Sequence, residues 1–191
     1  MRLTSHERVL TAFAHEEPDR VPAWCGASDE FWHKAKAELG LDDEGLLRFF
    51  GDDFRRVRAG YAGPKFALEH DNATYRTVFG IEREGLGYGQ PIGHPLAGAS
   101  LDAIHDYPWP DPAWACVDGV REVARAWNGE YAILGGDWSP FWHDAIDLVG
   151  MEELMTRMCV DPESVDALLG HIVDYYFAVS ARIFEVAGDV I

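Results

Sequence analysis

The chain has 191 residues, 48% of them hydrophobic and 13% aromatic, which is enough for one sizeable core and too apolar for a disordered chain. Its 16 Lys and Arg and 33 Asp and Glu give a net charge of −17, which repels phosphate backbones and anionic membranes, so neither nucleic acid nor a membrane is an expected partner. The three cysteines are widely spaced, and the sequence shows neither a signal-peptide pattern nor an apolar run long enough to span a membrane, so we expect a cytoplasmic protein. The length predicts a single domain over residues 1–191.

The N-terminal part of the sequence predicts three helices and one short strand. A capping box at residues 4–7 begins the first helix, which Pro18 ends, and the short buried strand covers residues 21–26 (VPAWCG). Cap residues then place the second helix between 28 and 40 and the third between 42 and 51. Alternation of strands and helices is typical of an α/β fold.

The middle of the sequence predicts a second strand, an insertion and a connecting segment. Residues 54–61 (FRRVRAGY) form the strand, and residues 74–92, rich in Gly, Tyr and β-branched side chains, form a small β-hairpin insertion. Residues 101–114 are interrupted by prolines, so they are expected to contain at most one helical turn, after Ser100.

The C-terminal part returns to the same alternation. A helix over about 118–129 precedes the clearest strand of the chain, residues 131–136, and two helices follow over about 141–149 and 152–159. Asp161 and Pro162 begin a long helix that ends at Gly188, after which Val190-Ile191 begins another buried strand.

Four strands connected through helices predict the N-terminal half of a (β/α)₈ TIM barrel, since a complete barrel needs around 250 residues. An open half barrel leaves unpaired backbone at its edges. We therefore expect a truncated barrel, or one that covers its exposed sheet edge by forming a homodimer.

Five stretches resemble the uroporphyrinogen decarboxylase superfamily, which includes corrinoid- and thiol-directed methyltransferases. They occur in the same order as in that superfamily and are residues 5–24, 50–57, 78–84, 94–112 and 150–176. The resemblance covers nearly the whole chain, favours the methyltransferase branch and implies a TIM barrel. It implies a full-length enzyme that moves a methyl group between a corrinoid or other methylated donor and a thiol, with a corrinoid protein as a partner.

In that branch the second half of the barrel carries the His and Cys residues that bind zinc, which holds the thiol as a thiolate. None of those ligands can be assigned to this chain. We therefore expect no cofactor on these residues, zinc and a corrinoid in the full-length protein, and no activity from the isolated fragment.

Two other functions remain open. The decarboxylases place an arginine-bearing stretch after the first strand, an acid after the second and a tyrosine after the third. Here residues 24–30 contain no arginine, residues 60–62 contain no acid, and Ile146 stands near the tyrosine position. These departures disfavour uroporphyrinogen decarboxylation. The second alternative is a non-catalytic half barrel that binds a ligand or partner.

TIM barrels carry their active site at the carboxyl ends of the strands, so the candidate substrate-binding residues follow the predicted strands. They are Trp24, Cys25, Arg58, Tyr61, Gly136, Trp138 and His143. Arg58 could hold a carboxylate or phosphate bidentately. Asp137 is the candidate catalytic residue, as a hydrogen-bonding group or base.

Each candidate also has a purely structural interpretation. Asp137 could cap the following helix, Cys25 could be a small buried apolar side chain, and Trp142 is expected in the core. Arg56 is expected to pair with Asp52 or Asp53. The eight histidines show no HxH or HExxH spacing, so no metal site is expected within these residues.

Overall fold

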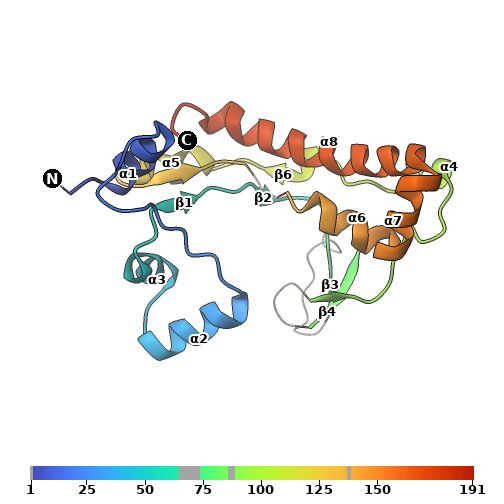
Figure 1. The fold of residues 1–191 in the computed structure, drawn as a ribbon, viewed down its shortest axis with the longest axis horizontal. Helices are drawn as coiled ribbons and strands as arrows, with labels where there is room; N and C mark the ends of the chain where they lie inside the picture. The colour runs from blue at the N-terminus through green and yellow to red at the C-terminus, as the bar shows by residue number, and fades with distance from the viewer. Residues whose placement is uncertain (1, 65–73, 86–88, 137–138) are drawn as a thin grey trace. The chain divides into compact units, whose positions relative to one another are not determined.

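The computed structural model describes residues 2–64, 74–85, 89–136 and 139–191 (Figure 1). These residues form two compact units. Unit 1 comprises the residues up to Ala59, residues 117–136 and residues 181–191. Unit 2 comprises residues 60–116 and 137–180. The sequence predicts a single domain, and the described residues divide into these two units.

Helix α1 (Ser5–Phe13) begins with the predicted capping box. The Thr4 hydroxyl accepts a hydrogen bond from Glu7 N at 3.1 Å, and the Glu7 carboxylate accepts one from Thr4 N at 2.8 Å. The helix ends five residues before the predicted stop at Pro18. The reason is local, because His15 adopts the left-handed conformation, with a φ of 59°.

Helices α2 (Asp29–Leu39) and α3 (Asp43–Phe50) confirm the predicted cap residues. The side chains of Ser28 and Asp42 accept hydrogen bonds from backbone amides of the first turns, and Gly40 and Gly51 end the helices in the left-handed conformation that glycine adopts most easily. The two helices contact each other (Figure 1).

The sheet of unit 1 is a parallel pair, β1 (Phe54–Arg56) and β7 (Ala132–Leu134). Phe54 lies opposite Ala132, and Val57 N donates to Leu134 O at 3.0 Å just beyond the strand. Both strands are shorter than predicted. β7 is followed by Gly135-Gly136, and the paired register ends at Arg56 and Leu134.

Residues 21–26, predicted as a strand, contain no assigned strand and are linked to β1 by one backbone hydrogen bond, from Asp53 N to Ala23 O at 2.9 Å. Pro22 has no amide hydrogen to donate. Carboxylates rather than a neighbouring strand accept from the amides of Ala23 and Cys25. These residues therefore cannot complete a ladder of backbone hydrogen bonds.

Helix α5 (Val120–Trp127) precedes β7, as predicted, and buries Val120 and Ala124. Val190-Ile191, predicted to begin a strand, instead follows a turn in which Val190 N donates to Ala187 O at 2.9 Å. The Ile191 side chain nevertheless packs against the end of β7, because a methyl group on Gly135 would lie 2.7 Å from two of its carbons.

Unit 2 contains two small antiparallel sheets. In the first, β2 (Gly60–Tyr61) pairs with β6 (Ala115–Cys116), so the predicted strand over 54–61 is divided between the units. The second is the predicted insertion, which has three strands instead of two: β3 (Thr74–Arg76), β4 (Glu82–Glu84) and β5 (Gln90–Pro91).

The α-helices of unit 2 agree with the sequence prediction, and a 3₁₀ turn adds to the one helical turn expected in residues 101–114. They are α4 (Leu101–His105), the 3₁₀ turn Pro112–Trp114, α6 (Phe141–Val149), α7 (Met151–Val160) and α8 (Pro162–Ala187), whose residues after Ser180 belong to unit 1. Their buried side chains form the core of the unit with the loop before β4. That core includes Phe79, Ile81, Ile104, Leu148, Leu154, Leu168 and Ile172.

The described residues therefore form a mixed α/β fold with short strands and no closed barrel. They contain one parallel pair of strands where four parallel strands were expected. Among these residues, no helix combines the length and the apolar character needed to cross a bilayer.

Candidate functional site

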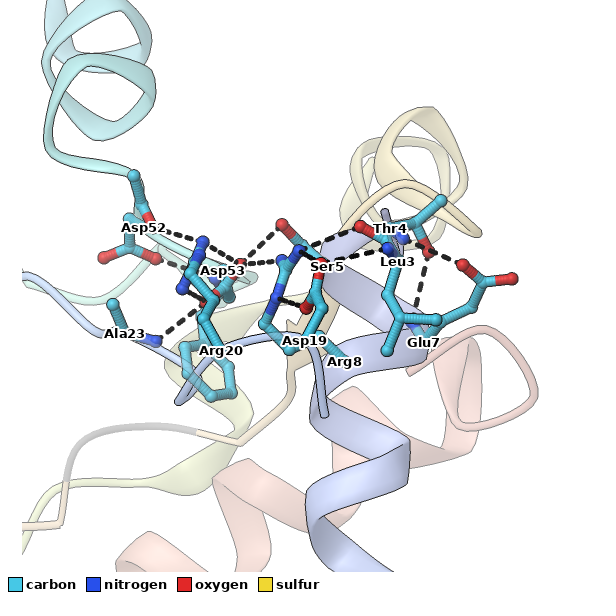
Figure 2. A network of polar contacts seen from close by, with 12 residues as sticks. Leu3, Thr4, Ser5, Glu7, Arg8, Asp19, Arg20, Ala23, Asp52 and Asp53 are labelled. Carbon is cyan, nitrogen blue, oxygen red and sulfur yellow. Dashed lines mark hydrogen bonds and ion pairs between the residues drawn. The ribbon is translucent and has the colours of Figure 1, made fainter. Parts of the chain in front are cut away.

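A buried carboxylate, Asp53, lies at the centre of a polar network in unit 1 (Figure 2). It accepts hydrogen bonds from Ser5 Oγ at 2.7 Å, Arg8 Nη1 at 2.8 Å and Ala23 N at 2.7 Å. The Arg20 guanidinium donates to both of its oxygens, at 2.6 and 2.8 Å. Burial raises the pKa of Asp53, but the hydrogen bonds from Arg20 and the other donors outweigh burial and hold the pKa below its ordinary value.

A second carboxylate, Asp19, holds Arg8 from another side. Arg8 Nε and Nη2 donate to the two oxygens of Asp19 at 2.6 and 3.0 Å, and this interaction keeps the pKa of Asp19 at about 2. The carboxylates and guanidinium groups of this network therefore form their hydrogen bonds with one another. The network fastens α1 and the segment that follows it to the start of β1, and we assign it a structural role.

The structure places Cys25 at the amino end of β1, because Cys25 N donates to the Asp52 carboxylate at 2.6 Å. The Cys25 thiol is half-buried, and burial raises its pKa, with Asp52 adding to the effect. The thiol is therefore protonated at neutral pH, which suits a packed side chain better than a nucleophile. Trp24 is 60% exposed.

Two predicted residues, Arg58 and Gly136, follow the carboxyl ends of β1 and β7. Each lies two residues past the last paired positions, Arg56 and Leu134. Arg58 is exposed. Gly136 is buried with a φ of 79°, a conformation that a side chain would strain.

Two other predicted site residues belong to unit 2. Tyr61 lies in β2 of unit 2, its hydroxyl donates to Pro64 O at 3.2 Å, and burial raises its pKa. His143 is an exposed residue of α6, also in unit 2. Asp137 and Trp138 lie outside the described residues.

The expected pairing of Arg56 with Asp52 or Asp53 is not seen; Arg55 fills a comparable role. Arg55 is buried and donates to both oxygens of Glu44, at 2.8 and 2.9 Å. Its guanidinium also lies 3.7 Å from the ring centre of Tyr131. Strand alternation turns Arg55 inward and leaves Arg56 on the opposite face.

Unit 2 contains a buried acid, Asp144, that the sequence interpretation did not single out. It is 4% exposed and accepts a hydrogen bond from Tyr176 Oη at 2.6 Å. Burial raises the pKa of Asp144 to about 6, although Tyr176 and Arg83 lower it. Arg83 forms an ion pair with Asp147, one turn further along α6. The signal was two aspartates three positions apart in a helix that is apolar apart from these residues and His143.

A buried acid that titrates near neutral pH can exchange a proton with a ligand, so Asp144 is a candidate acid–base group. Among the described residues, no three His, Cys, Asp or Glu side chains converge as ligands for a metal ion. The resemblance places its zinc ligands in the second half of the barrel, and none of them is assigned to the described residues.

Comparisons with known proteins found no matching family model, no matching curated protein and no matching solved structure.

Proposed function

We propose that these residues form one wall of a (β/α)₈ barrel in an enzyme of the uroporphyrinogen decarboxylase superfamily. The enzyme moves a methyl group between a corrinoid or other methylated donor and a thiol. Two lines of support meet in this proposal, namely the ordered resemblance along the sequence and the arrangement of extended segments in unit 1.

The observation that carries the proposal is a row of four neighbouring segments in unit 1. Residues 21–25 are bonded to the start of β1 through Ala23, β1 pairs in parallel with β7, and Ile191 packs against the end of β7. The row follows chain order, as the consecutive strands of a barrel do. Extending these short contacts into full strands would produce half of a barrel wall.

In this barrel the carboxyl end of the β1–β7 pair faces the substrate. Arg58 binds an anionic group of the thiol substrate, and Gly136 lets the backbone approach the substrate closely. Asp137 holds or moves a proton at the reacting thiol.

The other candidates contribute through their side-chain chemistry. Trp24, Tyr61 and Trp138 offer flat apolar rings to a cofactor or substrate, and His143 offers an imidazole. Cys25 lies at the amino end of β1 and packs there instead of lining the site. Zinc, which the resemblance implies, would be held by ligands outside this sequence and would stabilise the substrate as a thiolate.

The test is the loss of the methyl group from methylcobalamin, followed spectroscopically with the intact protein, added zinc and a thiol. We expect turnover with both 3-mercaptopropionate and 2-mercaptoethanol. Arg58→Ala should raise KM for the carboxylate-bearing thiol by about 10-fold or more and leave KM for the neutral thiol unchanged, because a charge-assisted hydrogen bond contributes roughly 1.5–3 kcal/mol. Arg56→Ala serves as the matched control.

Absence of demethylation with every thiol would refute methyl transfer. Decarboxylation of uroporphyrinogen by the same preparation would support the tetrapyrrole decarboxylase instead. If neither reaction occurs and the protein forms a homodimer through the open side of the sheet, a binding half barrel becomes the better account.

A further inference from the structure

Two imidazoles from sequence-distant segments meet at the surface of unit 2. His105 is the last residue of α4, and His171 lies 66 positions later, in α8. His105 Nδ1 and His171 Nε2 are 3.2 Å apart. His105 is exposed and His171 is half-buried, so an ion from solvent can reach both nitrogens.

The pair is held in place by neighbouring groups. The ring of Trp109 stacks on His171, with centroids 4.7 Å apart and planes inclined by 10°. Trp109 Nε1 in turn donates a hydrogen bond to Ile104 O at 2.8 Å, which ties the indole to α4. His171 is thus fixed before any ligand arrives, which lowers the entropy cost of binding.

The spacing of the two nitrogens suits a shared metal ion. Nitrogens about 2.0–2.1 Å from one ion lie roughly 2.9 Å apart at a right angle and roughly 3.3 Å apart at the tetrahedral angle. The observed 3.2 Å lies between these values. The same spacing permits a hydrogen bond between the rings, so an ion would bind in competition with the proton that they share.

The charge around the pair also favours a cation. Asp174, one turn along α8 from His171, interacts with it electrostatically, and the chain carries a net charge of −17. No third protein ligand converges on the pair among the described residues. The remaining coordination positions would therefore hold water, and the affinity would be lower than that of a three- or four-ligand site.

We propose that His105 and His171 bind one divalent transition metal ion that imidazole prefers, such as Zn²⁺, Ni²⁺ or Cu²⁺. The ion links α4 to α8 and so stabilises unit 2. This site is separate from the methyl-transfer proposal, which assigns zinc to ligands outside this sequence.

The test uses the 191-residue chain without an affinity tag, stripped of metal with a chelator. Calorimetric titration with Zn²⁺ alone should show one ion per chain. At a Zn²⁺ concentration about one hundred times Kd, Tm should rise by about 5 °C or more. His105→Ala should weaken binding at least tenfold and abolish the rise in Tm, because one of two ligands is lost.

His33→Ala is the matched control, since His33 is an exposed histidine of α2, and it should keep both the affinity and the rise in Tm. Quenching of Trp fluorescence by Cu²⁺ gives a second readout, because Trp109 lies against His171; the quenching should be reduced in His105→Ala. Unchanged Zn²⁺ affinity in both His105→Ala and His171→Ala would overturn the proposal, as would binding that requires two chains per ion.

Discussion

Asp53 and Asp144 are both buried carboxylates, but their pKa values shift in opposite directions. Asp53 is surrounded by two guanidinium groups, from Arg8 and Arg20, and hydrogen bonds outweigh the effect of burial. Asp144 has a neutral phenol as its hydrogen-bond donor, and burial dominates. The number of charged donors therefore decides which carboxylate stays ionised.

Replacing Asp53 with asparagine tests the structural role of the network in Figure 2. Asp53→Asn should lower the free energy of unfolding by about 3–5 kcal/mol, because it removes a buried charge that compensates Arg8 and Arg20. Denaturation in urea measures the change. Asp43→Asn is the control, since Asp43 is exposed and forms a surface ion pair with Lys36, and the free energy of unfolding of this variant should hardly change. Equal effects of the two substitutions would argue against the network.

Stability should depend on pH through Asp144. In the unfolded chain this carboxyl loses its proton near its ordinary pKa of 3.8, whereas the folded protein retains the proton up to about pH 6. The folded state therefore binds more protons between these values, and the contribution of Asp144 to stability is full below about pH 4. This contribution to the free energy of unfolding, about 3 kcal/mol in total, is lost as the pH rises from about 4 through 6.

Asp144→Asn should remove this dependence. Unfolding in urea at pH 4.5 and pH 7.5 should show that the variant gains stability relative to the unaltered chain at the higher pH. Asp166→Asn, at an exposed position of α8, should have the same free energy of unfolding as the unaltered chain at both pH values. A parallel pH dependence of Asp144→Asn and the unaltered chain would contradict a raised pKa.

Residues such as Asp53 could not be recognised from the sequence because their partners are distant. Asp53 binds groups 30 to 48 positions away, and nothing local distinguishes it from the neighbouring Asp52. Arg58 and Gly136 follow the short strands β1 and β7, but their part in a site stays a prediction. The tertiary fold determines which charged residue a side chain pairs with.

Helix boundaries were the most predictable elements. Ser28, Gly40, Asp42 and Gly51 act through hydrogen bonds and backbone conformations within a few residues, so the pattern of cap residues placed α2 and α3 correctly. Strands were predicted less well, because a strand ends where its partner ends. The stretch 54–61 appears continuous in sequence but pairs with two different partners.

The contact between Gly135 and Ile191 tests the row of segments in unit 1. Gly135→Ala should cost about 1–3 kcal/mol of unfolding free energy, because its methyl group would lie 2.7 Å from Ile191. Ile191→Ala removes the opposing carbons, so the same substitution should cost less in that background. A double-mutant cycle measures the coupling. Additive effects would show that Ile191 does not lie against β7.

At the scale of the whole molecule, the barrel proposal requires that the short extended segments of unit 1 are parts of neighbouring full strands. Residues 21–25, β1, β7 and Ile191 adjoin one another in chain order, but only β1 and β7 form a ladder of backbone hydrogen bonds. We propose that these contacts mark neighbouring strands of a barrel wall.

An experimental structure of the intact protein tests this proposal most directly. The account predicts a closed eight-stranded barrel in which residues 21–25, β1, β7 and 190–191 are consecutive parallel strands, with Arg58 and Gly136 at its carboxyl end. A structure in which β1 and β7 form an isolated pair, with no strand on either side, would contradict it.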